Sequence, residues 1–342
     1  MPAPPDMQQG SAPRVESITK NRQPTATLRA MIERAYGPGQ VPEDEGFATE
    51  LSYGFFNVLY RIRLRDGAQV VLKIAPPPDV AVMSREHRMM RNELAAMDLV
   101  RRESHVPVPR VDFADLTGEI VDADYFFMEY VDAACFGIAA EAGELSPEVV
   151  EAGFEHLGAV NRELNAIVGP HFGPLEGPGF ATWREAATAW FEDVLTDGER
   201  AAVDLGWKYD DVRETWDDHA SVLDDVTEPR LVEVDLWMKN SMIRDGRIVA
   251  IIDHERAMFG DPLMEAGLTG LDLPVFPDPA PFMRGFGLGE LDESQRTRRH
   301  LYTLWLAAVM LVETTYRGQT PQQYRWACDQ LDIAMGLLGR TT

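Results

Sequence analysis

The stretch LVEVDLWMKN, residues 231–240, ends a run typical of a β-strand and places an acid, Asp235, five positions before an amide, Asn240. The stretch IVAIIDHERAMFGDP, residues 248–262, ends a second β-branched run with another acid, Asp253. β-Branched residues favour strands, and the sequence RDG at 244–246 is a hairpin turn signal. The turn predicts that 241–244 pairs with 247–252, which brings Asp253 beside the loop that holds Asp235 and Asn240.

This arrangement suits phosphoryl transfer, in which a protein mainly positions the reactants and neutralises charge on the phosphate oxygens. One acid must accept the hydrogen bond of the attacking hydroxyl, and Asp235 suits that role. An acid and an amide must hold Mg²⁺ against the phosphates, and Asp253 and Asn240 supply the oxygen ligands that Mg²⁺ prefers.

Composition excludes several other classes of protein. The chain has 342 residues and a net charge of −24, which argues against nucleic acid as a partner because a phosphate backbone needs a basic footprint. The longest apolar run, 301–312, is too short to cross a bilayer and predicts a buried helix and no membrane association. The two cysteines cannot form a disulfide framework, which fits a reducing cytoplasm.

The negative charge is concentrated in residues 131–230, which hold 22 acids and 6 bases and so carry −16 of the −24. One interpretation is a solvated acidic face on helices. The other is an acidic surface that attracts a cationic substrate by long-range steering, an effect that salt weakens.

Hydrophobic periodicity divides the chain into three parts. Residues 1–23 are expected to form a disordered lead. Residues 24–131 alternate like strands around helices at 24–37 and 84–103, which predicts a small lobe with an antiparallel sheet and a hinge at its end. Residues 132–342 are mostly helical, with the hairpin of 241–252 embedded in them. The predicted fold is α+β, with the two lobes in the order found in protein kinases.

The motifs DLWMKN and IIDHERAMFGDP resemble those of the aminoglycoside phosphotransferase family, whose members have a kinase-like fold and act on antibiotics and other small molecules. The resemblance extends over about residues 45–335. It implies that Lys73, in VVLKIA, binds the α- and β-phosphates of a nucleotide. Glu93 is then the helix glutamate that pairs with that lysine, with Glu86 as the alternative. Gly54 lies where the family has its phosphate-covering loop.

The resemblance also implies the site of the nucleotide base. The segment FFMEYVDA matches the linker that binds adenine through backbone groups of Glu129 and Val131, with Met128 lining the pocket. The implied cofactors are ATP, or GTP, and Mg²⁺.

The chain departs from the family pattern at two histidines. The family usually reads His-Gly-Asp where this chain reads Glu233-Val234-Asp235, and it usually has a histidine where this chain has Asn165. A buried carboxylate at 233 needs a partner. Arg256 is the first candidate and Asn165 the second, whereas His254 is interpreted as an ordinary loop histidine.

The function expected from these features is ATP- and Mg²⁺-dependent transfer of the γ-phosphate to a hydroxyl of a small molecule. An antibiotic is the favoured acceptor, and the acidic stretch 131–230 is compatible with a cationic one. Two alternatives stay open: a metabolic kinase for an amino alcohol or a sugar, and an inactive nucleotide-binding relative. The protein is expected to be a monomer or a homodimer.

Overall fold

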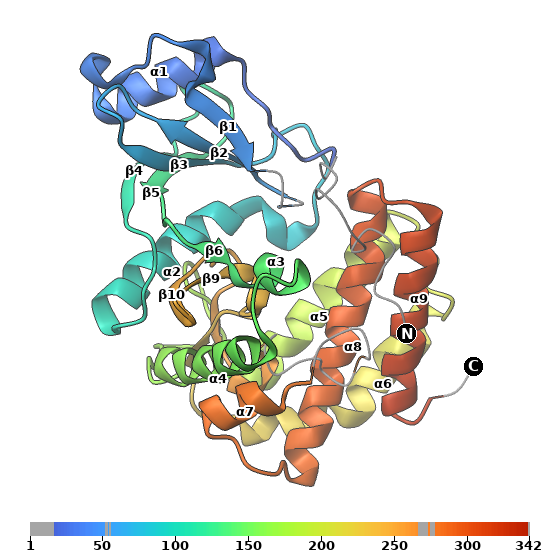
Figure 1. The fold of residues 1–342 in the computed structure, drawn as a ribbon. Helices are drawn as coiled ribbons and strands as arrows, with labels where there is room; N and C mark the ends of the chain where they lie inside the picture. The colour runs from blue at the N-terminus through green and yellow to red at the C-terminus, as the bar shows by residue number, and fades with distance from the viewer. Residues whose placement is uncertain (1–16, 52–53, 55, 266–272, 274–277, 341–342) are drawn as a thin grey trace. The chain divides into compact units, whose positions relative to one another are not determined.

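The computed structural model describes residues 17–51, 54, 56–265, 273 and 278–340, and these form two compact units (Figure 1). The small unit runs to Val82 and resumes over Pro109–Asp132. The large unit comprises Met83–Val108 and the chain from Ala133 onward. The α+β class and the pairing of a sheet unit with a helical unit confirm the predicted fold.

The small unit is a five-stranded antiparallel sheet in the order β1-β2-β3-β5-β4. Its strands are β1 (Ala48–Leu51), β2 (Val58–Arg63), β3 (Gln69–Ile74), β4 (Val111–Asp115) and β5 (Tyr125–Glu129). Helix α1 (Thr25–Tyr36) lies over one face and buries Met31 and Ile32 against the sheet (Figure 1). Strand β2 alternates buried and more exposed residues, as expected of a strand with one face on the core.

Residues 17–23 correct the predicted extent of the lead. Lys20 and Asn21 are each 8% exposed. The Lys20 Nζ donates to the Asn57 carbonyl at 2.7 Å, and the Asn21 amide donates to the Ala75 carbonyl at 3.0 Å. These hydrogen bonds tie the segment to the ends of β2 and β3, so residues 17–23 belong to the small unit. The rest of the expected lead, 1–16, lies outside the described residues.

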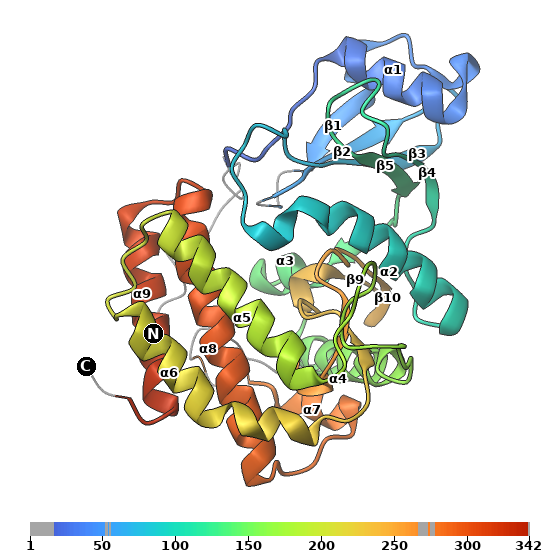
Figure 2. The same cartoon turned by 180° about the vertical axis from the view of Figure 1, so that it is seen from behind.

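The large unit is mainly helical, as expected. Its helices are α2 (Met89–Glu103), α3 (Phe136–Glu141), α4 (Pro147–Leu164), α5 (Trp183–Arg200), α6 (Tyr209–His219), α7 (Ala280–Phe286), α8 (Glu293–Tyr316) and α9 (Pro321–Leu337). Helices α8 and α9 lie side by side in both views (Figures 1 and 2). The run 301–312 forms the middle of α8 and is buried, and none of the described helices could cross a membrane.

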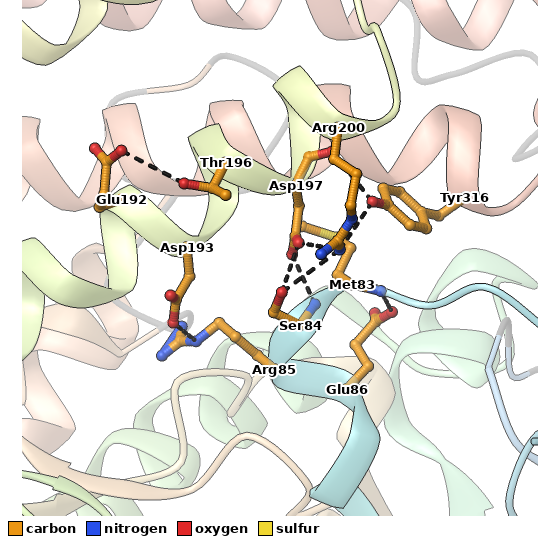
Figure 3. Close-up of polar contacts among 10 residues, drawn as sticks. All are labelled: Met83, Ser84, Arg85, Glu86, Glu192, Asp193, Thr196, Asp197, Arg200 and Tyr316. Atoms are coloured by element: carbon orange, nitrogen blue, oxygen red, sulfur yellow. Dashed lines mark hydrogen bonds and ion pairs between the residues drawn. The ribbon is translucent and has the colours of Figure 1, made fainter.

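Helix α2 belongs to the large unit, which corrects the predicted domain boundary. Polar contacts of residues 83–86, just before α2, explain this placement (Figure 3). The backbone N–H and the hydroxyl of Ser84 donate to the Asp197 carboxylate at 2.7 and 2.6 Å. Glu86 forms a buried ion pair with Arg317 of the segment after α8. Apolar side chains of α2, such as Val100, complete the attachment by joining the core of the large unit.

The predicted hairpin is present and forms part of one of two small sheets in the large unit. Strands β9 (Ser241–Arg244) and β10 (Arg247–Ile251) pair antiparallel, and β6 (Ala134–Cys135) extends that sheet. The two turn residues, Asp245 and Gly246, have φ values of 51° and 73°, the left-handed conformation that such a tight hairpin requires. The other sheet has the order β7-β11-β8, with β7 (Gly173–Pro174), β8 (Arg230–Val232) and β11 (Met258–Gly260).

Candidate active site

The loop after β8 carries Asp235, the predicted base, in a half-buried position. The Asn240 Nδ2 donates to the Asp235 carbonyl at 3.0 Å and to its Oδ2 at 3.1 Å. Asn240 closes a short 3-10 helix, residues 238–240, just before β9. The five-residue spacing read from the sequence therefore places the acid and the amide in direct contact.

Burial sets the protonation of the candidate base. Desolvation raises the pKa of Asp235 to about 6, and the nearby Asp253 carboxylate raises it as well. The guanidinium of Arg256 acts in the opposite direction and lowers this pKa. An acid with a pKa near 6 is ionised at neutral pH and remains basic enough to accept a proton from a hydroxyl.

A buried carboxylate from a distant segment holds this loop in place. Glu265 accepts hydrogen bonds from the backbone N–H groups of Glu233 and Leu236, both at 2.9 Å, and these groups bracket Asp235. The backbone between them is strained, because Val234 has a φ of 65°, a value that a β-branched residue rarely adopts. The family resemblance places a glycine at this position. Glu265 lies 30 residues away in sequence, and no local pattern pointed to it.

The second predicted acid, Asp253, follows β10 and lies beside the same loop. The Ile252 N–H donates to the Asn240 carbonyl at 2.9 Å, which joins the two segments. Asp253 has a φ of 67°, a left-handed conformation that Asp tolerates better than most residues. The hairpin therefore delivers Asp253 to the base loop, as its turn predicted.

Three carboxylates gather at this point. One oxygen each from Glu93, Asp253 and Glu255 lie within 4.8 Å of one another, with Glu93 and Glu255 buried. Oxygen donors alone suit Mg²⁺. Since the Nδ2 of Asn240 donates to Asp235, its side-chain oxygen is the atom left to face a cation. The residues present fit a magnesium ion. Glu255 was not among the predicted ligands, although its position two residues after Asp253 was a possible signal.

Glu233 is buried, and its partner differs from the one expected. Its Oε2 lies 3.0 Å from the Nδ1 of His254, a residue that is 1% exposed. The first expected partner, Arg256, is therefore wrong, since its ion pair is with Glu313 at 3.9 Å. The Asn165 amide donates instead to the Leu231 carbonyl at 2.7 Å, on the strand that leads into the loop.

The contact with Glu233 changes the interpretation of His254. Burial lowers the pKa of this histidine, but the Glu233 carboxylate more than offsets that effect and the pKa is raised overall. His254 follows Asp253 directly, so the pair connects the loop of the candidate base to that of the candidate metal ligand. In the family pattern a histidine occupies position 233. In this chain position 233 is a glutamate, and the histidine that contacts it is residue 254.

Apart from Glu93 on α2, the residues expected at the nucleotide lie on the small unit. Lys73 is 3% exposed on β3, with Phe126 of β5 opposite it in the sheet. Met128 is buried on β5. The N–H of Glu129 donates to the Arg110 carbonyl at 2.8 Å, and Val131 is half-buried just beyond the strand. Their binding roles remain predictions.

Two further expectations concern Gly54 and Glu86. Gly54 is described, but its neighbours 52–53 and 55, which form most of the expected phosphate-covering loop, lie outside the described residues. Glu86, the alternative partner of the lysine, is bound to Arg317 and to the Met83 N–H, so its carboxylate has a structural role in the large unit.

Asp261 stabilises the segment after the candidate metal ligands. Its carboxylate accepts a hydrogen bond from the Tyr302 hydroxyl at 2.6 Å and pairs with the Arg298 Nε at 2.9 Å. The sequence GDP therefore supplies a structural anchor for this segment.

Comparisons with known proteins identify a family and solved structures that this chain resembles. The family model described as "Phosphotransferase enzyme family" matches residues 48–301. No curated protein sequence matches the chain significantly. Solved structures with a similar fold include the following three. An aminoglycoside phosphotransferase APH(4)-Ia in complex with AMP-PNP and hygromycin B has a TM-score of 0.67 and 19% identity, over 92% of this chain and 100% of that one. A putative fructosamine-3-kinase from Thermobifida fusca has a TM-score of 0.63 and 19% identity, over 92% and 100% of the two chains. The streptomycin–ATP–APH(2")-IIa complex has a TM-score of 0.59 and 14% identity, over 91% and 96%.

Proposed function

Because this chain belongs to the phosphotransferase enzyme family and is a small-molecule kinase, we propose that it transfers the γ-phosphate of ATP, or of GTP, to a hydroxyl group of its acceptor with Mg²⁺ as the cofactor. The observation that carries the proposal is the contact between Asp235 and Asn240, with Asp253 on the segment joined to them. Solved neighbours bound to AMP-PNP, ATP or ADP support the use of a nucleotide.

Asp235 would act as the base. Its carboxylate would accept the hydrogen bond of the acceptor hydroxyl and orient the oxygen for attack, while the Asn240 amide fixes the carboxylate. Glu265 and the Glu233–His254 pair would hold the loop in the required position. These groups act by positioning, which is the main contribution a protein makes to phosphoryl transfer.

Asn240 and Asp253 would hold the magnesium ion, with Glu93 or Glu255 as a further ligand. The ion would neutralise charge on the phosphate oxygens. Lys73 would bind the phosphates from the small unit, and backbone groups near Glu129 and Val131 would bind the base.

An antibiotic is the first acceptor class to test, because the neighbouring structures hold hygromycin B and streptomycin. The similarity to a putative fructosamine-3-kinase supports a metabolic acceptor as the second candidate. We also propose that the enzyme works in the cytoplasm, in keeping with its two free cysteines.

The Asp235→Asn variant tests the proposed chemistry. The change removes the base and keeps the size of the side chain, so phosphate transfer should fall by at least a thousandfold while the affinity for ATP stays within about twofold. The measurement is ATP consumption across aminoglycosides, nucleoside antibiotics, choline and amino sugars, with nucleotide binding followed separately. Near-normal turnover by this variant would rule out Asp235 as the base.

A further inference from the structure

The side chain of Asn92 joins helix α2 to the turn that carries the candidate metal ligands. Its Nδ2 donates to the backbone carbonyl of Glu255 at 3.1 Å and to that of Ala257 at 2.7 Å. An asparagine amide nitrogen carries two N–H donors, one for each of these carbonyls. Two carbonyl acceptors also require that the nitrogen of the amide, and not its oxygen, faces the turn. One side chain therefore holds the backbone of the turn at two points.

This turn lies between β10 and β11 and depends on contacts with other segments. Within the turn, the Ala257 N–H donates to the His254 carbonyl at 3.1 Å. Asp253, at its start, has a φ of 67°, and such backbone keeps one conformation only when the surrounding structure fixes it. The base loop holds one side of the turn through the contact of Glu233 with His254. Asn92 holds the turn from α2.

Glu93, the next residue of α2, brings a carboxylate to the same turn. One of its oxygens lies within 4.8 Å of oxygens on Asp253 and Glu255, and Glu93 is 1% exposed. Consecutive residues of a helix have a fixed separation. The two residues therefore act together on one place: Asn92 fixes the backbone that carries Glu255, and Glu93 presents an oxygen to the same group of carboxylates.

The chemistry of Asn92 suits a role in positioning. Carboxylates that lie close together repel one another, so their separation must be restrained by the backbone that carries them. The Asn92 amide is uncharged, and it restrains the turn without neutralising the negative charge that attracts a cation. A lysine or an arginine at this position would form ion pairs with the acids and compete with a metal ion for them.

Helix α2 can provide this restraint because it is itself fixed to the large unit. Figure 3 shows the contacts just before the helix. The backbone N–H and the hydroxyl of Ser84 donate to Asp197, and Glu86 pairs with Arg317. Asn92 follows in the first turn of α2, which begins at residue 89. The helix and the turn between β10 and β11 belong to the same compact unit.

On the basis of the proposed function, we infer that Asn92 is a positioning residue for the magnesium ion. It acts through the carbonyls of Glu255 and Ala257, which it holds in place. The carboxylates of Asp253 and Glu255 then keep the separation that a small divalent cation requires. The protein groups that hold the ligands of a metal ion typically determine about 10–100-fold of its affinity.

Two cations of different size distinguish positioning from a general loss of structure. Mg²⁺ requires nearly octahedral oxygen ligands at about 2.0–2.1 Å, whereas Ca²⁺ accepts irregular sets of oxygens at about 2.3–2.6 Å. A turn that is less restrained should therefore lose affinity for Mg²⁺ to a greater extent than for Ca²⁺. A variant that only lowers the folded fraction of the protein would lose affinity for both cations equally.

The test is the affinity for AMP-PNP, measured by calorimetry with Mg²⁺, with Ca²⁺ or with EDTA. Asn92→Leu removes both donors and keeps a similar volume, and Asn92→Ala removes them with a smaller side chain. Both variants should bind AMP-PNP about tenfold or more weakly with Mg²⁺. With Ca²⁺ or EDTA the affinity should stay within about threefold of that of the unaltered protein. Agreement between the two variants excludes an effect of side-chain volume.

Ser84→Ala is the matched control. It removes a hydrogen bond of 2.6 Å from the same segment of the large unit, but it leaves the contacts of Asn92 with the turn in place. This variant should lower the temperature of thermal unfolding and leave the ratio of the affinities with Mg²⁺ and Ca²⁺ unchanged. Thermal unfolding of all three variants shows that each is folded at the temperature of the calorimetry.

The outcomes separate this inference from the proposed function. An unchanged ratio of the affinities with Mg²⁺ and Ca²⁺ in both Asn92 variants would overturn the positioning role, and so would an equal change of this ratio in Ser84→Ala. In either case the unaltered protein would still bind AMP-PNP more tightly with Mg²⁺ than with EDTA. If the unaltered protein binds AMP-PNP equally with Mg²⁺ and with EDTA, the proposed use of Mg²⁺ is itself wrong.

Discussion

Replacing His254 by Phe should destabilise the protein substantially, because it leaves the Glu233 carboxylate buried without a partner. Glu233 is 3% exposed, and within the part of the chain that the structure describes its Oε1 has no hydrogen-bond partner. The change removes the polar contact of Oε2 with the His254 ring, at 3.0 Å. Breaking a buried pair in this way costs about 3–5 kcal/mol. A total stability on the order of 5–15 kcal/mol makes that a large fraction.

The double variant Glu233→Met with His254→Phe distinguishes a buried pair from simple packing. Apolar residues of similar volume remove both polar groups, so most of the loss should be recovered, with a coupling energy of about 2–4 kcal/mol. The measurement is equilibrium unfolding in urea for the two single variants and the double. Additive effects within about 0.5 kcal/mol, or a loss below about 1 kcal/mol for His254→Phe, would refute the reasoning.

Three further predictions concern the same loops. The Asp253→Asn variant keeps a residue that tolerates the φ of 67° but loses the negative charge that would bind the metal. The Mg²⁺-dependent affinity for ATP, measured by calorimetry, should therefore fall at least tenfold. An unchanged affinity would contradict the metal-binding role of Asp253. The Val234→Gly variant should be about 1 kcal/mol more stable than Val234→Ala, the reverse of the usual order, because residue 234 has a φ of 65°. The exposed Ala202, with a φ of 53°, is the control, and Ala202→Gly should stabilise the protein by a similar amount in thermal unfolding. Because burial raises the pKa of Asp235 to about 6 and the base must be ionised, kcat/KM should fall as the pH drops below 6. Bound Mg²⁺ should move the midpoint of this acidic fall to a lower pH. A midpoint above pH 7 would contradict the assignment of Asp235 as the base.

Much of the fold could be predicted from local patterns. The five-residue spacing of Asp235 and Asn240 and the RDG turn are short-range features, and the contacts they predicted are present. Helix starts are also marked by local caps, as at α4, where the Ser146 side chain accepts a hydrogen bond from the Val149 N–H. Backbone hydrogen bonding and side-chain periodicity act over a few residues, so a single sequence contains this information.

Contacts between distant segments could not be predicted in the same way. The sequence predicts α2 as part of the small lobe, within residues 24–131. Glu86 and Ser84 find their partners more than a hundred residues later, and these contacts place the helix with the large unit. Glu265 likewise gave no local signal of its role, since the two N–H groups it binds belong to a loop 29 and 32 residues away.

The sequence by itself determined which residue types could perform phosphoryl transfer and in which order they occur. It also showed that a buried Glu233 would need a partner, because an unpaired carboxylate in the interior is unstable wherever it occurs. Only the tertiary structure decided that the partner is His254 and that Arg256 pairs instead with Glu313. The choice among several nearby cations depends on side-chain directions in two adjoining loops, and these directions are fixed by packing and by left-handed backbone at Val234 and Asp253.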